Sequence, residues 1–243
     1  MRVVRYQEIA EDLRRQISAG DLAPGRLLPS ESDLGAAYAA SRITVRKALD
    51  LLRVDGLVES RQGFGWFVPA DPLRQNLGRL GTIEAQLEES GIVSTRKILD
   101  FGFIVAPSAV RRVLGARRVL EVRRLNLADG DPFARVTVWC PEPLGKGLSL
   151  ADVERQPFYE LLDVELGGAT QTIAAGAASQ ADAALLKVPE LSPVLVCERT
   201  TSSVAGDPVL MSEHVFPGHR TEFVVDLPRA DRSIAPSGLR LVE

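Results

Sequence analysis

The sequence predicts an α+β fold in two parts: a mainly helical N-terminal segment that ends in a β-hairpin, and a larger antiparallel α+β segment. In the first part, apolar residues recur at helical spacing in successive stretches, and two short apolar runs around a Gly-containing turn follow them. In the second part, two Gly-Asp-Pro turns each separate runs rich in β-branched residues, which is the pattern of two hairpins. At 243 residues the chain is long enough for two domains of ordinary size.

Composition favours a globular protein without membrane spans. Hydrophobic residues make up 45% and charged residues 25% of the chain, and no apolar run approaches the roughly 20 residues that cross a bilayer. The N-terminus lacks the apolar core of a signal peptide, so we expect a cytoplasmic protein. Cys140 and Cys197 are isolated and lack CxxC spacing, so in a reducing compartment we expect two buried thiols rather than a disulfide.

The first two predicted helices lie within residues 6–40. Apolar residues at helical spacing from Tyr6 to Ile17 form one stripe, and Gly20 provides a C-terminal stop. After a turn, Ser30 is placed to cap a short second helix, because acidic residues follow it and complement the dipole of the first turn.

The third predicted helix is strongly amphipathic. Ser41 can cap it, and it runs to about Asp55, with Gly56 after its end. Its buried stripe follows the i, i+3, i+4, i+7 pattern and consists of Val45, Ala48, Leu49 and Leu52. The cations on its other sides are Arg42, Arg46, Lys47 and Arg53. Two helices joined by a tight turn, the second with a cationic exposed side, have the geometry that inserts into a DNA groove.

A β-hairpin after Gly56 completes this part as a wing. Two short apolar strands flank a turn, whose tip offers Arg61, Gln62 and the bare backbone of Gly63 to DNA. Phe64 and Trp66 could contact DNA, but we expect them instead to pack the wing onto the third helix. The predicted DNA contacts are Ser30, Ser41, Arg42, Thr44, Arg46, Lys47, Arg61, Gln62 and Gly63.

The DNA interpretation depends on placement and not on bulk charge. The chain has a net charge of -3, and residues 1–70 carry 10 basic and 9 acidic side chains. A charged helix face is more often merely solvated, but helix, turn, cationic helix and hairpin in this order favour DNA binding. Arg can donate two hydrogen bonds to guanine, and Ser41 or Thr44 can reach a phosphate or a base edge.

Several motifs in one order resemble the winged-helix domain of GntR-family bacterial transcription regulators. They occupy residues 6–10, 28–31, 41–49, 56–58 and 61–68. The resemblance implies that Ser41, Arg42, Thr44, Arg46, Gln62 and Gly63 fall on DNA-contact positions of the family. The family usually has Arg at the positions of Ser32 and Phe64, Val at Ala40 and Thr at Trp66. The Arg missing at position 32 removes one base or phosphate contact, so the operator sequence need not follow the family's.

The second part is predicted to contain two copies of a helix-plus-hairpin unit in one sheet. Residues 71–81 are polar with Pro and Gly and are predicted to be a linker, and residues 82–91 a short capped helix. At one constant offset, Leu120 aligns with Val196 and Arg123 with Arg199, and the two Gly-Asp-Pro turns coincide. Helical patterns at residues 108–114 and 179–187 precede the two hairpins.

From the linker onward the chain resembles the UTRA ligand-sensing domain of the HutC subfamily. The motifs that carry this resemblance lie at residues 124–132, 158–162, 186–189 and 206–209. The resemblance implies a chorismate-lyase-like antiparallel fold, a homodimer and a small metabolite that releases DNA. Members that sense phosphorylated amino sugars have two Arg residues, where this chain has Arg124 and Asn126. They also have Glu and Tyr where this chain has Val136 and Thr221. One Arg that clamps the phosphate and one acceptor for a sugar hydroxyl are therefore missing from this chain.

The sequence therefore predicts a regulator made of a winged helix-turn-helix domain (1–70), a linker (71–81) and an effector-binding and dimerisation domain (82–243). The predicted effector contacts, each of which could instead be an ordinary polar pairing, are Thr95, Arg124, Asn126, His214 and Arg220. The predicted function is a dimeric, metabolite-responsive repressor of a pseudo-palindromic double-stranded operator. The effector itself stays unidentified.

Two alternatives remain at this stage, an enzyme of lyase-like fold and a constitutive DNA-binding protein without an effector. His214 and His219 are the only histidines, and with Glu213 and Glu222 they do not form a zinc motif, so no metal is expected. No nucleophile motif and no phosphate-binding Gly-rich loop occurs, so neither catalysis nor a cofactor is expected.

Overall fold

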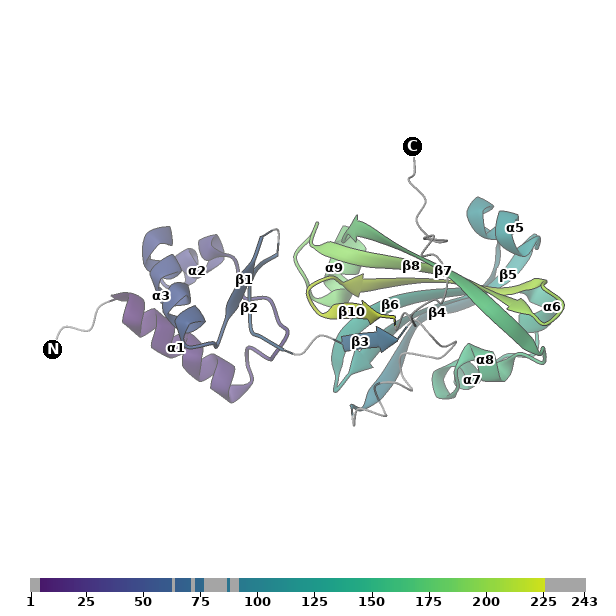
Figure 1. The fold of residues 1–243 in the computed structure, drawn as a ribbon, viewed down its shortest axis with the longest axis horizontal. Helices are drawn as coiled ribbons and strands as arrows, with labels where there is room; N and C mark the ends of the chain where they lie inside the picture. The colour runs from purple at the N-terminus through teal and green to yellow at the C-terminus, as the bar shows by residue number, and fades with distance from the viewer. Residues whose placement is uncertain (1–4, 63, 71–72, 77–86, 88–91, 226–243) are drawn as a thin grey trace, which may run out of the picture.

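The computed structural model describes residues 5–62, 64–70, 73–76, 87 and 92–225. A mainly helical unit formed by the N-terminal residues lies beside a larger unit built on a six-stranded sheet (Figure 1). The two-part α+β organisation predicted from the sequence is thus confirmed.

The N-terminal unit is a winged helix. Its elements are α1 (Arg5–Ala19), α2 (Glu31–Ala37), α3 (Arg42–Val54), β1 (Glu59–Arg61) and β2 (Gly65–Phe67). The strands β1 and β2 pair antiparallel and form the predicted wing. The core joins all three helices to the wing and contains Ile9, Ala10, Leu13, Leu28, Leu34, Val45, Ala48, Leu49, Leu52, Val58 and Val68. The predicted buried stripe of α3 is confirmed, since each of its four residues is 0% exposed.

Both predicted helix caps are present. The Ser30 hydroxyl accepts a hydrogen bond from the Asp33 amide, and the Asp33 carboxylate accepts one from the Ser30 amide, which completes a capping box. At the start of α3 the Ser41 hydroxyl accepts from the Thr44 amide. These two caps satisfy backbone amides at the first turns of α2 and α3.

The larger unit contains an antiparallel sheet in the order β4-β5-β6-β9-β8-β7. Its strands are β4 (Ser94–Val105), β5 (Arg118–Ala128), β6 (Asp131–Pro141), β7 (Leu166–Ala177), β8 (Pro193–Ser203) and β9 (Pro208–Pro217). The two predicted hairpins, β5–β6 and β8–β9, lie side by side at its centre. The turn between β5 and β6 has positive φ at both Asp129 (49°) and Gly130 (83°), as a two-residue type I′ turn requires.

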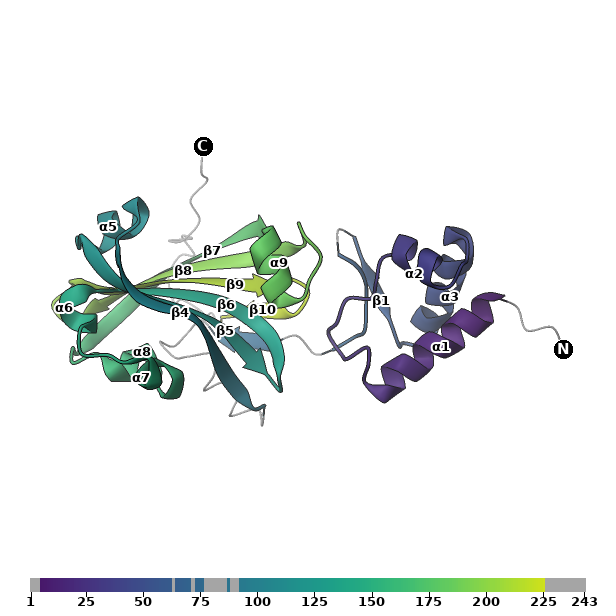
Figure 2. The ribbon, with the colours of Figure 1, turned by 180° about the vertical axis from the view of Figure 1, so that it is seen from behind.

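Helices cover both faces of this sheet. The face called outer below carries α5 (Ser108–Leu114) and α9 (Gln180–Leu186), which pack on residues of β5, β6, β8 and β9. The opposite, inner face carries α7 (Leu150–Arg155) and α8 (Phe158–Leu161), and the main core lies there. The short helix α6 (Glu142–Gly145) follows β6. The two views of the ribbon place α5 and α7–α8 on different sides of the sheet (Figures 1 and 2).

Part of the predicted linker belongs to the larger unit. Residues Leu73–Asn76 form β3, which pairs parallel with β10 (Thr221–Val224). Leu73 and Phe223 pack against the core of the inner face, so this ribbon contributes to its cover. The helix predicted at residues 82–91 lies outside the described residues except for Leu87, which is buried in the same core.

The two predicted helix-plus-hairpin units are present as α5–β5–β6 and α9–β8–β9, but the predicted alignment of their first strands is wrong by one residue. Arg199 lies on the inner face, where it bonds Tyr159 of α8, and the buried Arg124 occupies the same face on β5. Arg123 instead lies on the outer face, where its charge helps to lower the pKa of Asp182 of α9. In the first hairpin Ala128 and Asp131 pair across a two-residue loop, whereas in the second hairpin Ser203 and Asp207 bond across three residues. The extra loop residue shifts the alignment of the first strands by one position, and a shift of one residue moves a side chain to the opposite face.

The two cysteines are free and buried, as predicted. Cys140 lies on β6 and Cys197 on β8, and both contribute to the core of the inner face. Burial raises the pKa of each thiol to about 12, so both stay protonated and act as small hydrophobic side chains.

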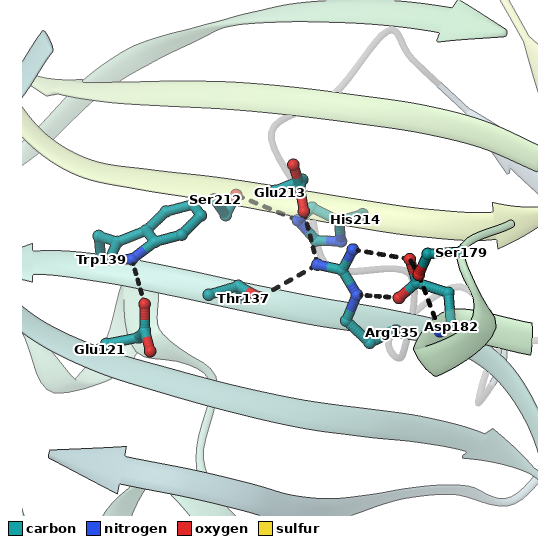
Figure 3. Close-up of polar contacts among 9 residues, drawn as sticks. All are labelled: Glu121, Arg135, Thr137, Trp139, Ser179, Asp182, Ser212, Glu213 and His214. Atoms are coloured by element: carbon teal, nitrogen blue, oxygen red, sulfur yellow. Dashed lines mark hydrogen bonds and ion pairs between the residues drawn. The ribbon is translucent and has the colours of Figure 1, made fainter. Parts of the chain in front are cut away.

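On the outer face, Arg135 of β6 ties α9 to the sheet (Figure 3). Its Nε lies 2.7 Å from Asp182 Oδ1, and its Nη1 donates to Glu213 of β9 and to Thr137. Burial favours a raised pKa for Asp182, but hydrogen bonds from Arg135 and Ser179 outweigh it and hold the pKa below its usual value of 3.8. The side chains of Arg135 and Asp182 are only 11% and 18% exposed, so solvent screens this pair weakly.

We predict that Asp182→Asn destabilises the protein by about 1–3 kcal/mol at pH 7, because Arg135 loses a charged acceptor. A carboxylate whose folded pKa is depressed stabilises above its unfolded pKa, and that contribution disappears as pH falls through the folded value. The difference between wild type and variant should therefore shrink from pH 7 to pH 3. Urea unfolding at both pH values measures it, with the exposed Glu154→Gln as the control. A difference that does not change with pH would contradict this account.

Candidate functional site

The exposed side of α3 forms a polar, mainly cationic surface. It surrounds an open depression of about 490 Å³, lined by Glu31, Arg42, Ile43, Arg46, Lys47 and Asp50. The opposite side of the helix is fully buried in the winged-helix core. Because the core fixes the helix rotation, the cationic side cannot turn inward.

Glu31, the first residue of α2, holds Arg46 in place. Its carboxylate accepts hydrogen bonds from Arg46 Nε at 3.0 Å and Nη2 at 2.9 Å, a bidentate geometry. It also accepts from Trp66 Nε1 of the wing at 3.2 Å. Hydrogen bonding from Arg46 lowers the pKa of Glu31, against the opposite effect of its burial, so the carboxylate is ionised at neutral pH. One carboxylate therefore links α2, α3 and the wing.

The remaining residues predicted to contact DNA also lie on this side of the winged helix or in the wing. Ser30 and Ser41 are exposed at the two helix starts, and Ser41 Oγ lies 2.8 Å from Thr44 Oγ1. Arg42 and Lys47 are exposed on α3. In the wing, Arg61 and Gln62 are exposed, and Gly63 lies outside the described residues.

The two wing aromatics differ in their packing. Trp66 packs on the winged-helix core, with the Arg53 guanidinium 5.8 Å from its ring centroid, as predicted. Phe64, in contrast, packs against the larger unit: its ring centroid is 5.8 Å from that of His219. The prediction that Phe64 packs onto α3 is therefore wrong. Its ring packs against His219, which is 155 positions further along the chain, and local sequence patterns do not reveal a contact of that length.

His219 is the centre of the junction between the two units. It is 7% exposed, and its Nε2 donates to the Gly25 carbonyl at 3.0 Å. Phe64 and Phe67 of the wing flank its ring, with the Phe67 centroid at 6.0 Å. Burial lowers the pKa of His219 to about 4, partly offset by the bond to Gly25, so the ring is neutral at pH 7.

Two arginines extend the junction. Arg26 forms an ion pair with Asp131, at the start of β6. The Arg220 guanidinium lies against Gly25, where φ is +75° and an added Cβ would be only 2.9 Å from Arg220 Nε. Gly25 thus provides both the backbone conformation and the space that this contact requires. Burial lowers the pKa of Arg220, and the charge of Asp131 acts against that effect.

Polar side chains gather on the inner face of the sheet at its centre. They come from β5, β7, β8, β9 and α8, and we call them the inner polar cluster: Arg124, Asn126, Tyr159, Gln171, Arg199, Ser212 and His214. Arg124, Val136 and His214 are paired in register across β5, β6 and β9, which places them in one row. His214 stacks on Phe216, with 5.8 Å between ring centroids, and its Nε2 lies 3.1 Å from Ser212 Oγ.

Of the predicted effector contacts, the structure brings Arg124, Asn126 and His214 together and separates the other two. Thr95 of β4 is exposed, and its neighbour Arg96 is the residue paired with Asn126, so Thr95 lies on the opposite face. Arg220 lies at the junction with Gly25.

Sequence reasoning missed four members of the inner polar cluster. Arg199 donates from Nη1 to Tyr159 Oη at 3.0 Å and from Nε to Gln171 Oε1 at 2.7 Å, and Ser212 is paired in register with it. Alternation along β8 could have identified Arg199, because Cys197 and Thr201 on either side of it are buried. Tyr159 lies on α8, and only the fold brings it to the sheet.

The two histidines lie in different environments, one in the inner polar cluster and one at the junction. Among the residues that the structure describes, no group of three or more His, Cys, Asp or Glu side chains is arranged to hold a metal ion. Over the same residues, no helix has the length and apolar character needed to cross a membrane.

Comparisons with known proteins identify both parts of the chain. Residues 5–68 match the family described as bacterial regulatory proteins, gntR family, and residues 89–222 match the UTRA domain. The chain is 33% identical over 97% of its length to the HTH-type transcriptional regulator Rv0792c of Mycobacterium tuberculosis, and it covers 89% of that protein. It is 27% identical over 90% of its length to the HTH-type transcriptional repressor NagR of Bacillus subtilis, and it covers 93% of that protein.

Similarity of fold extends over most of the chain. The crystal structure of PhnF from Mycobacterium smegmatis superimposes with a TM-score of 0.61, covering 91% of this chain and 100% of PhnF at 23% identity. The fold and the cationic α3 surface define a DNA-binding transcription regulator with a separate effector-sensing domain, and not an enzyme. The chain belongs to the GntR family of bacterial regulators, and its second domain is a UTRA domain.

We predict that the His219 imidazole titrates near pH 4 in the intact protein. Because its folded pKa is depressed, docking of the two domains is fully stable above the ordinary value of 6.5 and weakens as pH falls toward 4. Gly25→Ala should open the junction by contact with Arg220 and raise the His219 pKa toward 6.5. Histidine NMR signals measured against pH test this, and His214→Gln assigns the two signals. Titration of His219 near 6.5 in the wild type would contradict the buried junction.

Proposed function

We propose that the protein is a homodimeric repressor that binds a pseudo-palindromic operator through α3 and leaves it when a small anionic metabolite binds the UTRA domain. The observation that supports this most is the cationic exposed side of α3, with Arg46 held in a bidentate pair. A repressor among the relatives, NagR, supports the direction of control. We place this activity in the cytoplasm, where a regulator of this family meets bacterial DNA.

In this proposal α3 lies in the major groove. Arg46 is pre-oriented by Glu31 and donates to a base edge, while Arg42 and Lys47 contact phosphates or neighbouring bases. Ser30, Ser41 and Thr44 lie at helix N-termini, where hydroxyls and amides suit phosphate oxygens. Arg61, Gln62 and Gly63 of the wing complete the contacts. A two-fold dimer would present two such surfaces to two half-sites.

The inner polar cluster is the proposed effector site. Arg124 and Arg199 come from the two central hairpins and supply two cationic groups, which favours a ligand with carboxylate or phosphate groups. Val136 lies between Arg124 and His214 in the same row, so the ligand should carry an apolar or weakly polar segment there. This lining differs from the two-Arg, Glu and Tyr set of the amino-sugar-phosphate sensors, so we propose a different anionic metabolite.

The turn before β10 is the proposed route from effector to DNA. Thr221 begins β10 and is buried, while Phe223 packs in the core of the inner face. The two preceding residues, His219 and Arg220, contact Gly25 of the winged helix. A ligand that shifts β10 would therefore change the docking of the DNA-binding domain, a coupling between two distinct sites.

We predict that Arg46→Ala weakens operator binding by about 1–3 kcal/mol and relaxes the base preference at one position of each half-site. The removal of a bidentate donor explains both effects. Gel-shift titrations against the operator and its single-base variants measure them. Arg15→Ala, which removes an exposed cation from α1, is the matched control and should leave both unchanged. Unchanged affinity and specificity for Arg46→Ala would remove Arg46 from the proposed contacts.

We predict that Arg124→Ala keeps operator binding but abolishes its release by the effector. A thermal-shift screen of carboxylate and phosphate metabolites identifies the ligand first, since a ligand at 100 times its Kd stabilises by about 2.7 kcal/mol. Thr95→Ala is the control, because Thr95 lies on the other face of the sheet. If Arg124→Ala unfolds the domain, Arg124→Lys replaces it. If the effector still releases the operator from the folded Arg124 variant but no longer releases it from Thr95→Ala, the proposed site is wrong.

A further inference from the structure

Ile43 is an exposed apolar residue within the cationic surface of α3. It is 71% exposed, whereas Val45, Ala48 and Leu49 of the same helix are fully buried. A single exposed apolar side chain is common and needs no explanation by itself. Ile43, however, lines the same depression as Arg42, Arg46 and Lys47, on the side that we propose faces DNA.

Helix geometry places Ile43 where a base edge would come. Ile43, Arg46, Lys47 and Asp50 follow the i, i+3, i+4, i+7 pattern, so they form one stripe along the exposed side of α3. Ile43 is the second residue of the helix and therefore lies in its first turn. In helix-turn-helix proteins the N-terminal residues of the second helix reach the base edges.

The chemistry of the groove selects one partner for an apolar side chain at this position. Phosphates, sugars and nearly all base-edge groups in the major groove are polar, and the C5-methyl of thymine is the apolar exception. A β-branched side chain has two carbon branches close to the backbone and little rotamer freedom to lose. Contact with a methyl group would remove apolar surface of both partners from water.

A protein partner for this position is disfavoured by charge. A second copy docking its own α3 here would bring Arg42, Arg46 and Lys47 of both chains together, and like charges at short distance repel. A polyanion with an apolar spot satisfies both the cations and Ile43, and duplex DNA with a thymine is such a surface.

We propose that Ile43 reads the C5-methyl group of a thymine in the operator half-site and is thus a specificity-determining residue beside Arg46. This inference rests on the proposed binding of α3 in the major groove. It adds recognition of one base by an apolar contact to the hydrogen bonds proposed for Arg46.

The test removes the methyl group from DNA and the side chain from protein in turn. Selection from random duplexes with the full-length protein yields a preferred site, in which each thymine is replaced singly by deoxyuridine. At one position the replacement should weaken wild-type binding about fourfold, the value of one buried methyl group. The same replacement should have no effect on Ile43→Ala, and Ile43→Ala should itself lose about fourfold on the thymine site. Fluorescence anisotropy measures the four affinities, which form a double-mutant cycle.

Val54→Ala is the matched control, because Val54 is also β-branched, lies at the other end of α3 and is 82% exposed. This variant should keep the full deoxyuridine penalty, and so should Arg46→Ala. A preferred site without thymine, or equal deoxyuridine penalties in wild type and Ile43→Ala at every position, would overturn the role of Ile43. Absence of any preferred duplex would instead overturn the proposed function itself, so the two failures are distinguishable.

Discussion

The carboxylate of Glu31 accepts hydrogen bonds from Arg46 of the recognition helix and Trp66 of the wing, and its side chain is only 16% exposed. The arrangement of the proposed DNA-binding surface depends on this contact. A charge in such surroundings is stable only when it is paired, so Glu31 needs Arg46, while Arg46 gains an orientation that fits a planar acceptor. The hydrophobic core fixes how α3 is rotated, and Glu31 then fixes how its principal cation is presented.

In the UTRA domain the two faces of one sheet are specialised. Arg135 secures α9 to the outer face by ion pairs, whereas the inner face concentrates polar side chains around Arg124 and Arg199. Side chains alternate between the two faces along every strand, so stabilising groups and the proposed ligand-binding groups can lie one residue apart without interfering. His219 connects this sheet to the winged helix, and its neutral ring suits a contact enclosed by Phe64 and Phe67. This turn is therefore the contact through which we propose that effector binding and DNA binding influence each other.

Much of the winged helix could be predicted from sequence, because its signals are local. Ser30 and Ser41 cap the helices as expected, and the buried stripe of α3 follows helical periodicity. The UTRA site was less predictable. Thr95 was predicted in the pocket but is one residue away from the inner face, because which residues of β4 face inward depends on its pairing with β5. Arg123 was aligned with Arg199, but the loops of the two hairpins differ in length by one residue. Phe64 of the winged helix contacts His219, and Arg220 of the UTRA domain contacts Gly25. Contacts between residues so far apart in the sequence leave no periodic signal.

We propose that two α3 helices bind one operator and that an effector in the UTRA domain controls this binding. Hydroxyl-radical footprinting of the operator, with and without the metabolite found by thermal shift, tests it most directly. We expect two protected segments related by a two-fold axis and separated by a whole number of helical turns of roughly 10 base pairs each. Both should disappear together when the metabolite is added. A single protected segment, or protection unchanged by a metabolite that stabilises the protein, would contradict the account.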